Sequence, residues 1–425
     1  MFTDIKDFIL FVESQKRNEK KTSLDRMRRI AEIYGNPQDK LQFIHIGGTN
    51  GKGSLCSFIE NILIASGLNV GKFISPYIVS FNERITFNKQ YISDIDLLKY
   101  GNFILSKYDY LDELGIARLS FFEFVTLLSF LYFKDKEYID VVVLEVGIGG
   151  LLDSTNIVKN VIASAISNVN LDHMNILGNT IEEIALQKLG IVKQNVPFFT
   201  IQNDALTDLF ITETNKKNSL LNIINFSDIK NLNVSDECTT FDYKELNNVK
   251  INLLGKYQSE NAAIAIEICK YLNDNNIYKI NQNCIYEGLL NTFWPGRLQV
   301  VSKEPLIIVD GAHNIDAINR QVEFIKVIKG NRKLKVYFAV SANKDKEHMI
   351  SLLDNVADKI VFTEFHYKRS DEAINLLNFT TIADKSIEYD LVEAVNKSLN
   401  LSNDWIIIFT GSLYFVSEIL KIFNK

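Results

Sequence analysis

The chain has 425 residues, of which 47% are apolar and 23% are charged. This balance is that of a folded globular protein and excludes a disordered chain, while the length predicts two domains. With 46 Lys and Arg against 52 Asp and Glu, the net charge of -6 excludes a strongly basic surface that would bind nucleic acid or an anionic membrane. We therefore expect neither partner, and any bound phosphate must be held locally.

The N-terminal residues lack the basic segment and following apolar stretch of an export signal, so we expect a cytoplasmic protein. The apolar run at residues 121–133 is interrupted by Glu123 and is shorter than the roughly 20 residues of a membrane span, so it predicts a core helix. The cysteines have no CxxC spacing and no neighbouring His, and neither a zinc site nor a disulfide framework is expected.

Strands are predicted from short runs rich in β-branched and other apolar residues, which alternate with helical patterns. The predicted strands are residues 43–46, 141–146, 161–166, 306–309, 335–340, 359–363 and 405–410. Such continuous runs suit parallel strands covered on both faces, and the alternation predicts doubly wound α/β units.

Residues 203–252 are polar and Asn-rich, with weak strand patterns at 239–243 and 249–253, and we interpret them as an excursion of the first domain. The Pro-Gly pair within residues 294–297 predicts a linker. The fold class is therefore α/β with two domains, residues 1–293 and 298–425.

A glycine-rich loop lies between the predicted strand 43–46 and a helical pattern at 54–65. Glycines allow positive φ and close backbone approach, so that successive amides can surround phosphate oxygens at a helix N-terminus. Lys52 adds charge and Ser54 adds a hydroxyl near a metal. The spacing departs from GxxxxGK[ST], because Gly47 lies four residues before Gly51 and Gly53 separates Lys52 from Ser54. We still predict a nucleotide phosphate loop.

Carboxylates follow two of the predicted strands. Glu145 ends the run 141–146, and the run 161–166 leads to Asp172 and His173. Ligands of open α/β sheets bind beyond the carboxyl ends of strands, so these groups are candidates for holding Mg²⁺ beside a triphosphate. A surface position is the alternative for Glu145, and His173 alone is weak evidence.

Many stretches together resemble the folylpolyglutamate synthase and dihydrofolate synthase family, within the wider group of Mur-type ligases. They occur in the family's order along nearly the whole chain. The stretches are residues 45–54, 75–77, 81–85, 122–124, 145–150, 153–156, 171–173, 177–178, 187–191, 254–262, 294–298, 310–314 and 410–414.

The resemblance implies an N-terminal P-loop-type ATPase domain with a mostly parallel sheet and a C-terminal Rossmann-like domain, with ATP bound between them. The ATP-binding residues that it implies are Gly48, Thr49, Asn50, Gly51, Lys52, Gly53, Ser54, Asn261, Arg297 and Asp310.

The implied Mg²⁺ ligands are Ser75, Glu145 and His173, with room for a second Mg²⁺ or a monovalent cation. Lys188 matches a lysine that is carbamylated in related enzymes, whereas without the resemblance it would be interpreted as a solvated helix charge. With Lys52, Glu145 and His173, it completes the implied catalytic set.

The resemblance places Phe121, Phe122 and Asp153 where related enzymes bind the pteroate, although aromatic residues on a helix are more often part of the core. His313 and Ser412 are implied to grip glutamate or the acyl phosphate. The expected reaction is ATP-dependent addition of L-glutamate to the glutamyl carboxylate of a reduced folate through an acyl phosphate. We expect a monomer.

Two departures concern dihydropteroate handling. Bifunctional members often carry an Ile-Asp-Leu-Gly-like stretch and an Arg after Gly-Gly, where this chain has residues 19–22 (Glu-Lys-Lys-Thr) and Leu151. We therefore expect folate chain extension, with the bifunctional enzyme that also joins dihydropteroate and glutamate as the alternative.

Three other functions are less favoured. A GTPase switch would need an acid in place of Lys346 in the Asn343–Lys346 stretch. A non-catalytic folate-binding protein would not need the full set of phosphate and metal positions. A cell-wall Mur ligase would carry an additional N-terminal UDP-binding domain, and it would lack the folate-type stretches.

Overall fold

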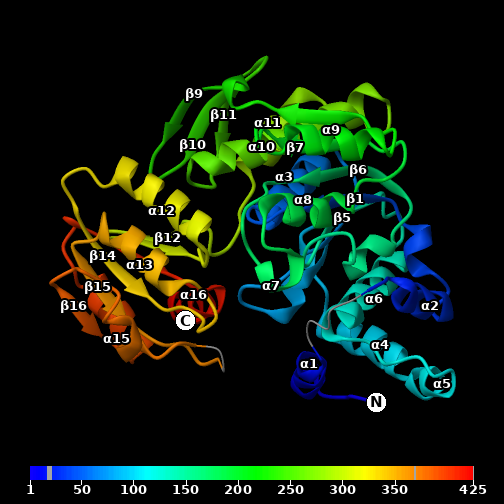
Figure 1. Ribbon diagram of the computed structural model, residues 1–425, viewed down its shortest axis with the longest axis horizontal. Coiled ribbons are helices and arrows are strands. Elements are labelled where there is room, and N and C mark those ends of the chain that lie inside the picture. Colours follow the sequence, from blue (N-terminus) through cyan, green and yellow to red (C-terminus); the bar gives the residue numbers. More distant parts are fainter. Residues whose placement is uncertain (17–21, 368–369, 425) are drawn as a thin grey trace. The chain divides into compact units, whose positions relative to one another are not determined.

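The computed structural model describes residues 1–16, 22–367 and 370–424, which form two compact units. Unit 1 comprises Met1–Asp228 and Asn261–Leu289, and unit 2 comprises Ile229–Glu260 and Leu290–Lys425 (Figure 1). Of the stretch 19–22 singled out above, residues 19–21 lie outside the described residues. No helix in the described ranges is long and apolar enough to cross a membrane.

Unit 1 is built on an eight-stranded sheet in the order β4-β3-β2-β5-β1-β6-β7-β8. The six strands from β2 to β8 are parallel to their neighbours, and β3 and β4 are antiparallel additions at one edge. The strands are β1 (Phe43–Gly47), β2 (Val70–Phe73), β3 (Ile85–Phe87), β4 (Gln90–Tyr91), β5 (Val141–Glu145), β6 (Val161–Ile166), β7 (Phe198–Ile201) and β8 (Leu221–Ile224). Because β1, β5 and β6 are neighbours, the loops that leave their carboxyl ends share one edge of the sheet.

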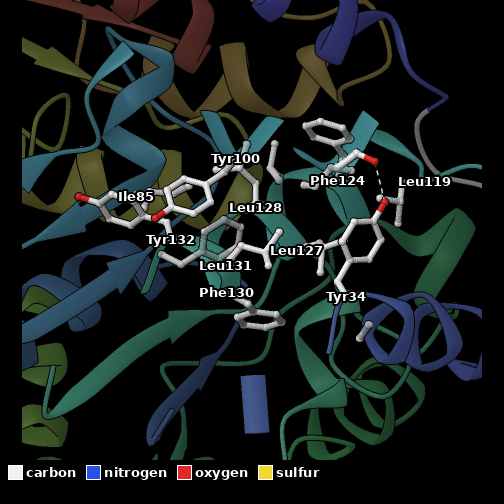
Figure 2. Packing of buried hydrophobic residues seen from close by; sticks show 14 of the residues in the cluster. Tyr34, Ile85, Tyr100, Leu119, Phe124, Leu127, Leu128, Phe130, Leu131 and Tyr132 are labelled. Carbon is white, nitrogen blue, oxygen red and sulfur yellow. Dashed lines mark hydrogen bonds between the residues drawn. The ribbon is translucent and has the colours of Figure 1, made fainter. Parts of the chain in front are cut away.

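The helices of unit 1 pack on its sheet and on one another. They are α1 (Ile5–Ser14), α2 (Asp25–Ile33), α3 (Lys52–Ala65), α4 (Asp94–Leu105), α5 (Tyr108–Glu113), α6 (Phe121–Lys134), α7 (Met174–Leu177), α8 (Ile181–Leu189), α9 (Thr207–Asn215), α10 (Lys256–Asp274) and α11 (Gln282–Leu290), of which α10 begins in unit 2. Helix α6 is buried along nearly its whole length, as its apolar sequence predicts. Its leucines and aromatic rings pack with Tyr34 and Tyr100 in a core in which the Tyr34 hydroxyl donates to the carbonyl oxygen of Ile104 at 2.6 Å (Figure 2).

Unit 2 contains a six-stranded sheet in the order β12-β13-β17-β14-β15-β16, in which only β12 is antiparallel, and a three-stranded antiparallel sheet β11-β10-β9. The strands are β9 (Ile229–Val234), β10 (Thr239–Tyr243), β11 (Leu246–Ile251), β12 (Gln299–Lys303), β13 (Leu306–Asp310), β14 (Lys333–Phe338), β15 (Lys359–Phe362), β16 (Lys385–Ile387) and β17 (Trp405–Thr410). The helices are α12 (Ile315–Ile328), α13 (Lys346–Asp354), α14 (Ala373–Leu376), α15 (Leu391–Leu399) and α16 (Leu413–Phe423).

The later part of the Asn-rich stretch 203–252 groups differently from the sequence-based division, which placed the whole stretch in the first domain. Residues 229–260 belong to unit 2. Leu254 is part of the hydrophobic core of that unit, and Val234 packs against it. An ion pair between Glu237 and Lys303 at 3.3 Å adds a surface contact. Burial of these apolar side chains, which local sequence does not reveal, determines the grouping.

Candidate nucleotide and ligase site

The predicted phosphate loop connects the central strand β1 to α3. The helix begins at Lys52, two residues earlier than its sequence pattern indicated, and Gly51 precedes it with φ of 82°. Gly48 has φ of 143°. These left-handed conformations favour glycine, and they bring the loop directly into a helix N-terminus, where exposed amides and the helix dipole attract anions.

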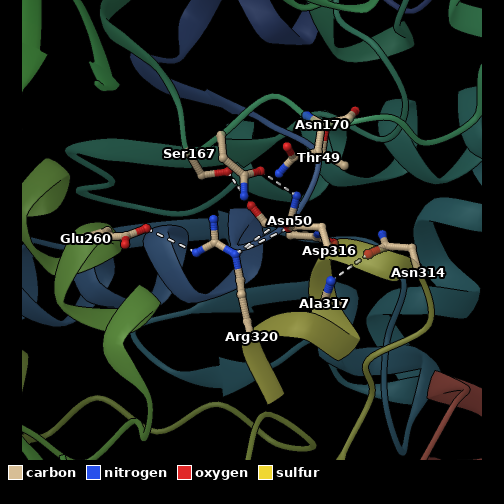
Figure 3. A network of polar contacts seen from close by, with 10 residues as sticks. Thr49, Asn50, Ser167, Asn170, Glu260, Asn314, Asp316, Ala317 and Arg320 are labelled. Carbon is tan, nitrogen blue, oxygen red and sulfur yellow. Dashed lines mark hydrogen bonds and ion pairs between the residues drawn. The ribbon is translucent and has the colours of Figure 1, made fainter. Parts of the chain in front are cut away.

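The loop is tied to the segment that follows β6. The Thr49 amide donates to the carbonyl oxygen of Asn168 at 2.9 Å, and the Asn50 amide donates to the Asn168 side chain at 2.8 Å. The Ser167 hydroxyl donates to the carbonyl oxygen of Asn50 at 2.5 Å, and Thr49 exchanges hydrogen bonds with the backbone of Asn170 at 3.0 and 3.1 Å (Figure 3). The loop is therefore held in shape by protein contacts.

Close packing explains why glycine occupies positions 48 and 51. A Cβ at position 48 would lie 2.0 Å from the Ser167 hydroxyl, and one at position 51 would lie 2.7 Å from the side-chain oxygen of Asn261. Asn261, predicted to contact nucleotide, thus lies directly against the phosphate loop. Ser54 is buried in the first turn of α3, and the Lys52 ammonium donates to the carbonyl oxygens of Gly48 and Thr49 at 3.1 and 3.2 Å.

Two of the three predicted metal ligands are neighbours. Glu145 ends β5 with 4% of its surface exposed, and its carboxylate accepts from the Ser75 amide at 2.9 Å. His173 is exposed at the start of α7 with φ of 51°. Within the described ranges, no three His, Cys, Asp or Glu side chains form a cluster that could hold a metal. The donors nevertheless fit Mg²⁺, because a carboxylate and a hydroxyl supply oxygen ligands and phosphate oxygens can supply others.

Lys188 is buried, and the interpretation of it as a solvated charge, made without the resemblance, is wrong. Only 3% of its surface is exposed, on α8. Burial, together with the smaller effect of the Lys52 charge, lowers the pKa of its ammonium to about 7, although Asp172 opposes the shift. Its amine is therefore largely neutral near pH 7.5, and its surroundings include the phosphate-loop lysine.

The loop from Gly147 to Leu151 links several predicted site residues. A Cβ at position 147 would lie 2.6 Å from the ring of Phe122, and one at position 150 would lie 2.7 Å from the carbonyl oxygen of Lys188. The Leu151 amide donates to the carbonyl oxygen of Gln187 at 2.7 Å. This loop follows Glu145 closely in the chain and packs against both the Phe122 ring and the backbone of Lys188.

Asp153 and Phe121 have well-defined protein contacts. Asp153 accepts from the Ile148 amide at 3.0 Å, from the Thr155 amide at 3.0 Å and from the Thr155 hydroxyl at 2.6 Å. Phe121 is buried at the start of α6, with the guanidinium of buried Arg84 5.1 Å from its ring centre. Sequence reasoning assigned no role to Arg84, although it lies within a stretch that carries the family resemblance.

In unit 2 the predicted residues meet at the carboxyl ends of β13 and β17. Asp310 ends β13, and its carboxylate accepts from the Leu298 amide at 3.3 Å and from Gln321 at 2.8 Å. Burial raises the pKa of Asp310, and the charge of Arg297 opposes that shift. Arg297 lies next to Gly311, whose carbonyl oxygen its guanidinium approaches at 3.5 Å.

His313 and Ser412 follow these strands. The Nδ1 atom of His313 is 2.8 Å from the carbonyl oxygen of Gly311. Ser412 precedes α16 and accepts from the Tyr414 amide at 3.2 Å, while Asn314 accepts from the Ala317 amide at the start of α12 (Figure 3). Two helix N-termini thus follow neighbouring parallel strands, which favours binding of anionic groups at this edge.

The phosphate loop, the strand-end carboxylate and the second α/β unit define an ATP-dependent ligase of the Mur type. The family model of the Mur ligase middle domain matches residues 46–269, and that of the Mur ligase glutamate ligase domain matches residues 296–413. Curated relatives include dihydrofolate synthase/folylpolyglutamate synthase of Bacillus subtilis, 34% identical over 99% of both chains, and folylpolyglutamate synthase of Lacticaseibacillus casei, 31% identical over 97% of this chain and 96% of that one. The chain belongs to the folylpolyglutamate synthase/dihydrofolate synthase family.

Solved structures agree with this assignment. The apo form of L. casei folylpolyglutamate synthase (FPGS) superimposes with a TM-score of 0.88, 29% identity and full coverage of both chains. An FPGS complex with AMPPCP and folate superimposes with a TM-score of 0.86 and 30% identity over 98% of both chains. The α/β fold with two mostly parallel sheets is therefore confirmed.

Proposed function

We propose that this protein is a folylpolyglutamate synthase that adds L-glutamate to the glutamyl carboxylate of a reduced folate. The main support is that unit 1 of this family member contains a phosphate loop, the buried carboxylate of Glu145 at the end of β5, and the buried amine of Lys188 with a pKa of about 7. A similar FPGS structure holds a nucleotide analogue and folate together, which supports the same pair of ligands here.

The first chemical step requires a carboxylate to gain a leaving group. The γ-phosphoryl group of ATP passes to the folate carboxylate, which releases ADP and leaves an acyl phosphate. The loop amides from Gly48 to Ser54 and the Lys52 ammonium stabilise the negative charge on the phosphate oxygens, so the protein contributes positioning and electrostatics. Mg²⁺ bound by Ser75, Glu145 and His173 would supply further neutralisation of that charge.

The second step forms the amide. The α-amine of glutamate attacks the acyl carbon, and inorganic phosphate leaves. In this proposal Asn261, Arg297 and Asp310 bind the nucleotide, His313 and Ser412 hold glutamate or the acyl phosphate, and Phe121, Phe122 and Asp153 hold the pteroate. The backbone donors at the starts of α12 and α16 support an anion site at that edge of unit 2.

We also propose that Lys188 carries a carbamate. A neutral amine attacks CO₂ and loses a proton, which converts the neutral buried amine into a carbamate anion. At pH 7.5, a pKa of about 7 leaves about three quarters of the amine neutral, against about one in a thousand for an ordinary lysine. Protein incubated with ¹³C-bicarbonate should give a carbamate carbon signal that Lys188→Gln removes. A signal that persists in this variant would contradict the assignment.

Product analysis tests the proposed activity. The protein is incubated with ATP, glutamate and either tetrahydrofolate or dihydropteroate, and products are identified by mass spectrometry. Tetrahydrofolate should gain one glutamyl mass. If neither substrate gains this mass, the proposal fails. Lys52→Ala should abolish turnover while the circular dichroism spectrum is unchanged, whereas Lys216→Ala, on the exposed end of α9, should retain it.

Dihydrofolate synthase activity is the second candidate function. It is favoured by the Bacillus subtilis relative, which is described as both a dihydrofolate synthase and a folylpolyglutamate synthase. Leu151, one of the two departures from the bifunctional pattern, is 45% exposed beside the Gly147–Gly150 stretch. The dihydropteroate arm of the product assay decides between the monofunctional and bifunctional enzymes.

A further inference from the structure

A chain of hydrogen bonds runs from β1 to the loop that follows β5. His45 is fully buried on β1, two residues before the phosphate loop, and its Nε2 atom is 2.9 Å from the Thr155 hydroxyl oxygen. The Thr155 hydroxyl lies 2.6 Å from Asp153, and the other carboxylate oxygen of Asp153 accepts from the Ile148 amide. The family resemblance gave roles to Asp153 and to the phosphate loop but none to His45 or Thr155.

The chemistry of these groups fixes the direction of every hydrogen bond. The Asp153 carboxylate oxygen accepts the single hydroxyl proton of Thr155. The Thr155 oxygen must then accept from His45, so the imidazole carries its proton on Nε2. Its Nδ1 atom is buried and has no hydrogen-bond partner among the described residues. A second proton there would be a buried charge, and burial, followed by the charge of Lys193, lowers the pKa of His45 to about 3.

The end of this chain is the loop that touches several parts of the predicted site. The Ile148 amide is held by Asp153, and the Asp153 amide in turn donates to the carbonyl oxygen of Gly150 at 3.1 Å. The flanking glycines leave no space for a side chain against Phe122 on one side and the backbone of Lys188 on the other. A small shift of this loop would therefore move both neighbours.

We propose that His45 and Thr155 are positioning residues, which hold Asp153 and the Gly147–Leu151 loop in the geometry that binds the folate substrate. This inference rests on the proposed function. Neither residue is expected to touch the reacting atoms. Their effect should appear in folate binding more than in nucleotide binding, because the contacts that hold the phosphate loop come from the Ser167–Asn170 segment.

Paired substitutions at both positions test the role of the hydrogen bonds. Thr155→Val keeps the shape of the side chain and removes the hydroxyl, whereas Thr155→Ser keeps the hydroxyl. His45→Leu removes the Nε2 donor, whereas His45→Gln supplies an amide donor of similar reach. Ser164→Ala is the matched control, because Ser164 is a buried hydroxyl residue paired with His45 in the register of β1 and β6 and lies outside the hydrogen-bond chain.

We expect Thr155→Val and His45→Leu to raise KM for the folate substrate about tenfold, the effect of one buried hydrogen bond, with KM for ATP changed less than twofold. Thr155→Ser, His45→Gln and Ser164→Ala should stay within about twofold of the unmodified protein in both constants. Hydrogen exchange of the Ile148 and Leu151 amides should accelerate in Thr155→Val and not in Ser164→Ala.

Several results would overturn the proposal. An unchanged folate KM in Thr155→Val, or an equal rise in His45→Leu and His45→Gln, would show that the hydrogen bonds do not position the site. If the Val and Leu variants do not fold whereas the Ser and Gln variants do, the network serves the fold and the positioning role is refuted. Absence of ligation by the unmodified protein refutes the proposed function instead, and the exchange rates then still test the loop.

Discussion

Substitution of Lys188 by Met should stabilise the protein most at acidic pH. The folded state holds this amine with a pKa of about 7, whereas an unfolded chain gives it the ordinary value of 10.5. Between these values the unfolded state binds more protons, so the contribution of Lys188 to stability becomes more favourable as pH rises. Transferring this amine from the unfolded chain into its buried site costs on the order of 5 kcal/mol at pH 6, where it is mostly protonated in both states, and about 2 kcal/mol at pH 9, where it gives up its proton on folding. The gain from Lys188→Met should differ by about 3 kcal/mol between these two pH values.

Urea denaturation in CO₂-depleted buffer at both pH values provides the assay. Trp294 and Trp405 both belong to unit 2, so their fluorescence identifies the transition of that unit. The remaining circular dichroism change then reports unit 1, which carries Lys188. Lys193→Met serves as a comparison, because burial lowers the pKa of Lys193 less far, to about 8. The stability gain from Lys193→Met should therefore differ between pH 6 and pH 9 by about half as much as the gain from Lys188→Met. An equal stability gain at pH 6 and pH 9 for Lys188→Met would refute a buried neutral amine.

Two further substitutions test the packing of the phosphate loop and the buried ion pair between Lys72 and Glu60. Gly48→Ala should abolish nucleotide binding, measured by calorimetry, because the added Cβ would overlap the Ser167 hydroxyl. Gly115→Ala is the control and should retain binding, because Gly115 also has a positive φ but an added Cβ would have no atom within 4 Å. Lys72→Met should lower the free energy of unfolding of unit 1 by about 3–5 kcal/mol in the same urea assay, because it leaves the buried carboxylate of Glu60 without its ammonium partner. A second change, Glu60→Gln, should recover much of that loss, and a double variant as unstable as the single one would contradict this explanation.

The strands that build the sites were predictable from sequence. Every run predicted as a strand, from residues 43–46 to residues 405–410, overlaps a strand of the structure, and Glu145 does end one of them. The signal was strong because a strand buried on both faces must be apolar throughout. By contrast, several strands were missed, among them β2, which is only four residues long and contains Gly71 and Lys72.

Tertiary contacts of single side chains were not predictable. The sequence around Lys188 is that of an amphipathic helix, and only the packing of α8 shows that the lysine is buried in surroundings that include Lys52. Likewise, the role of Thr155 depends on His45, which lies 110 positions away in the chain. The family resemblance named the residues of the site, but their contacts come from the fold.

The interleaved division of the chain has a consequence for its synthesis. Residues 229–260 leave the ribosome before unit 1 is complete at Leu289, yet the core that Val234 and Leu254 of this segment join includes β13 and α12, which follow later. During translation this polar, Asn-rich segment is therefore exposed while it waits for its partners. Its low apolar content should limit aggregation at that stage, which gives the polar composition of residues 229–252 a physical advantage.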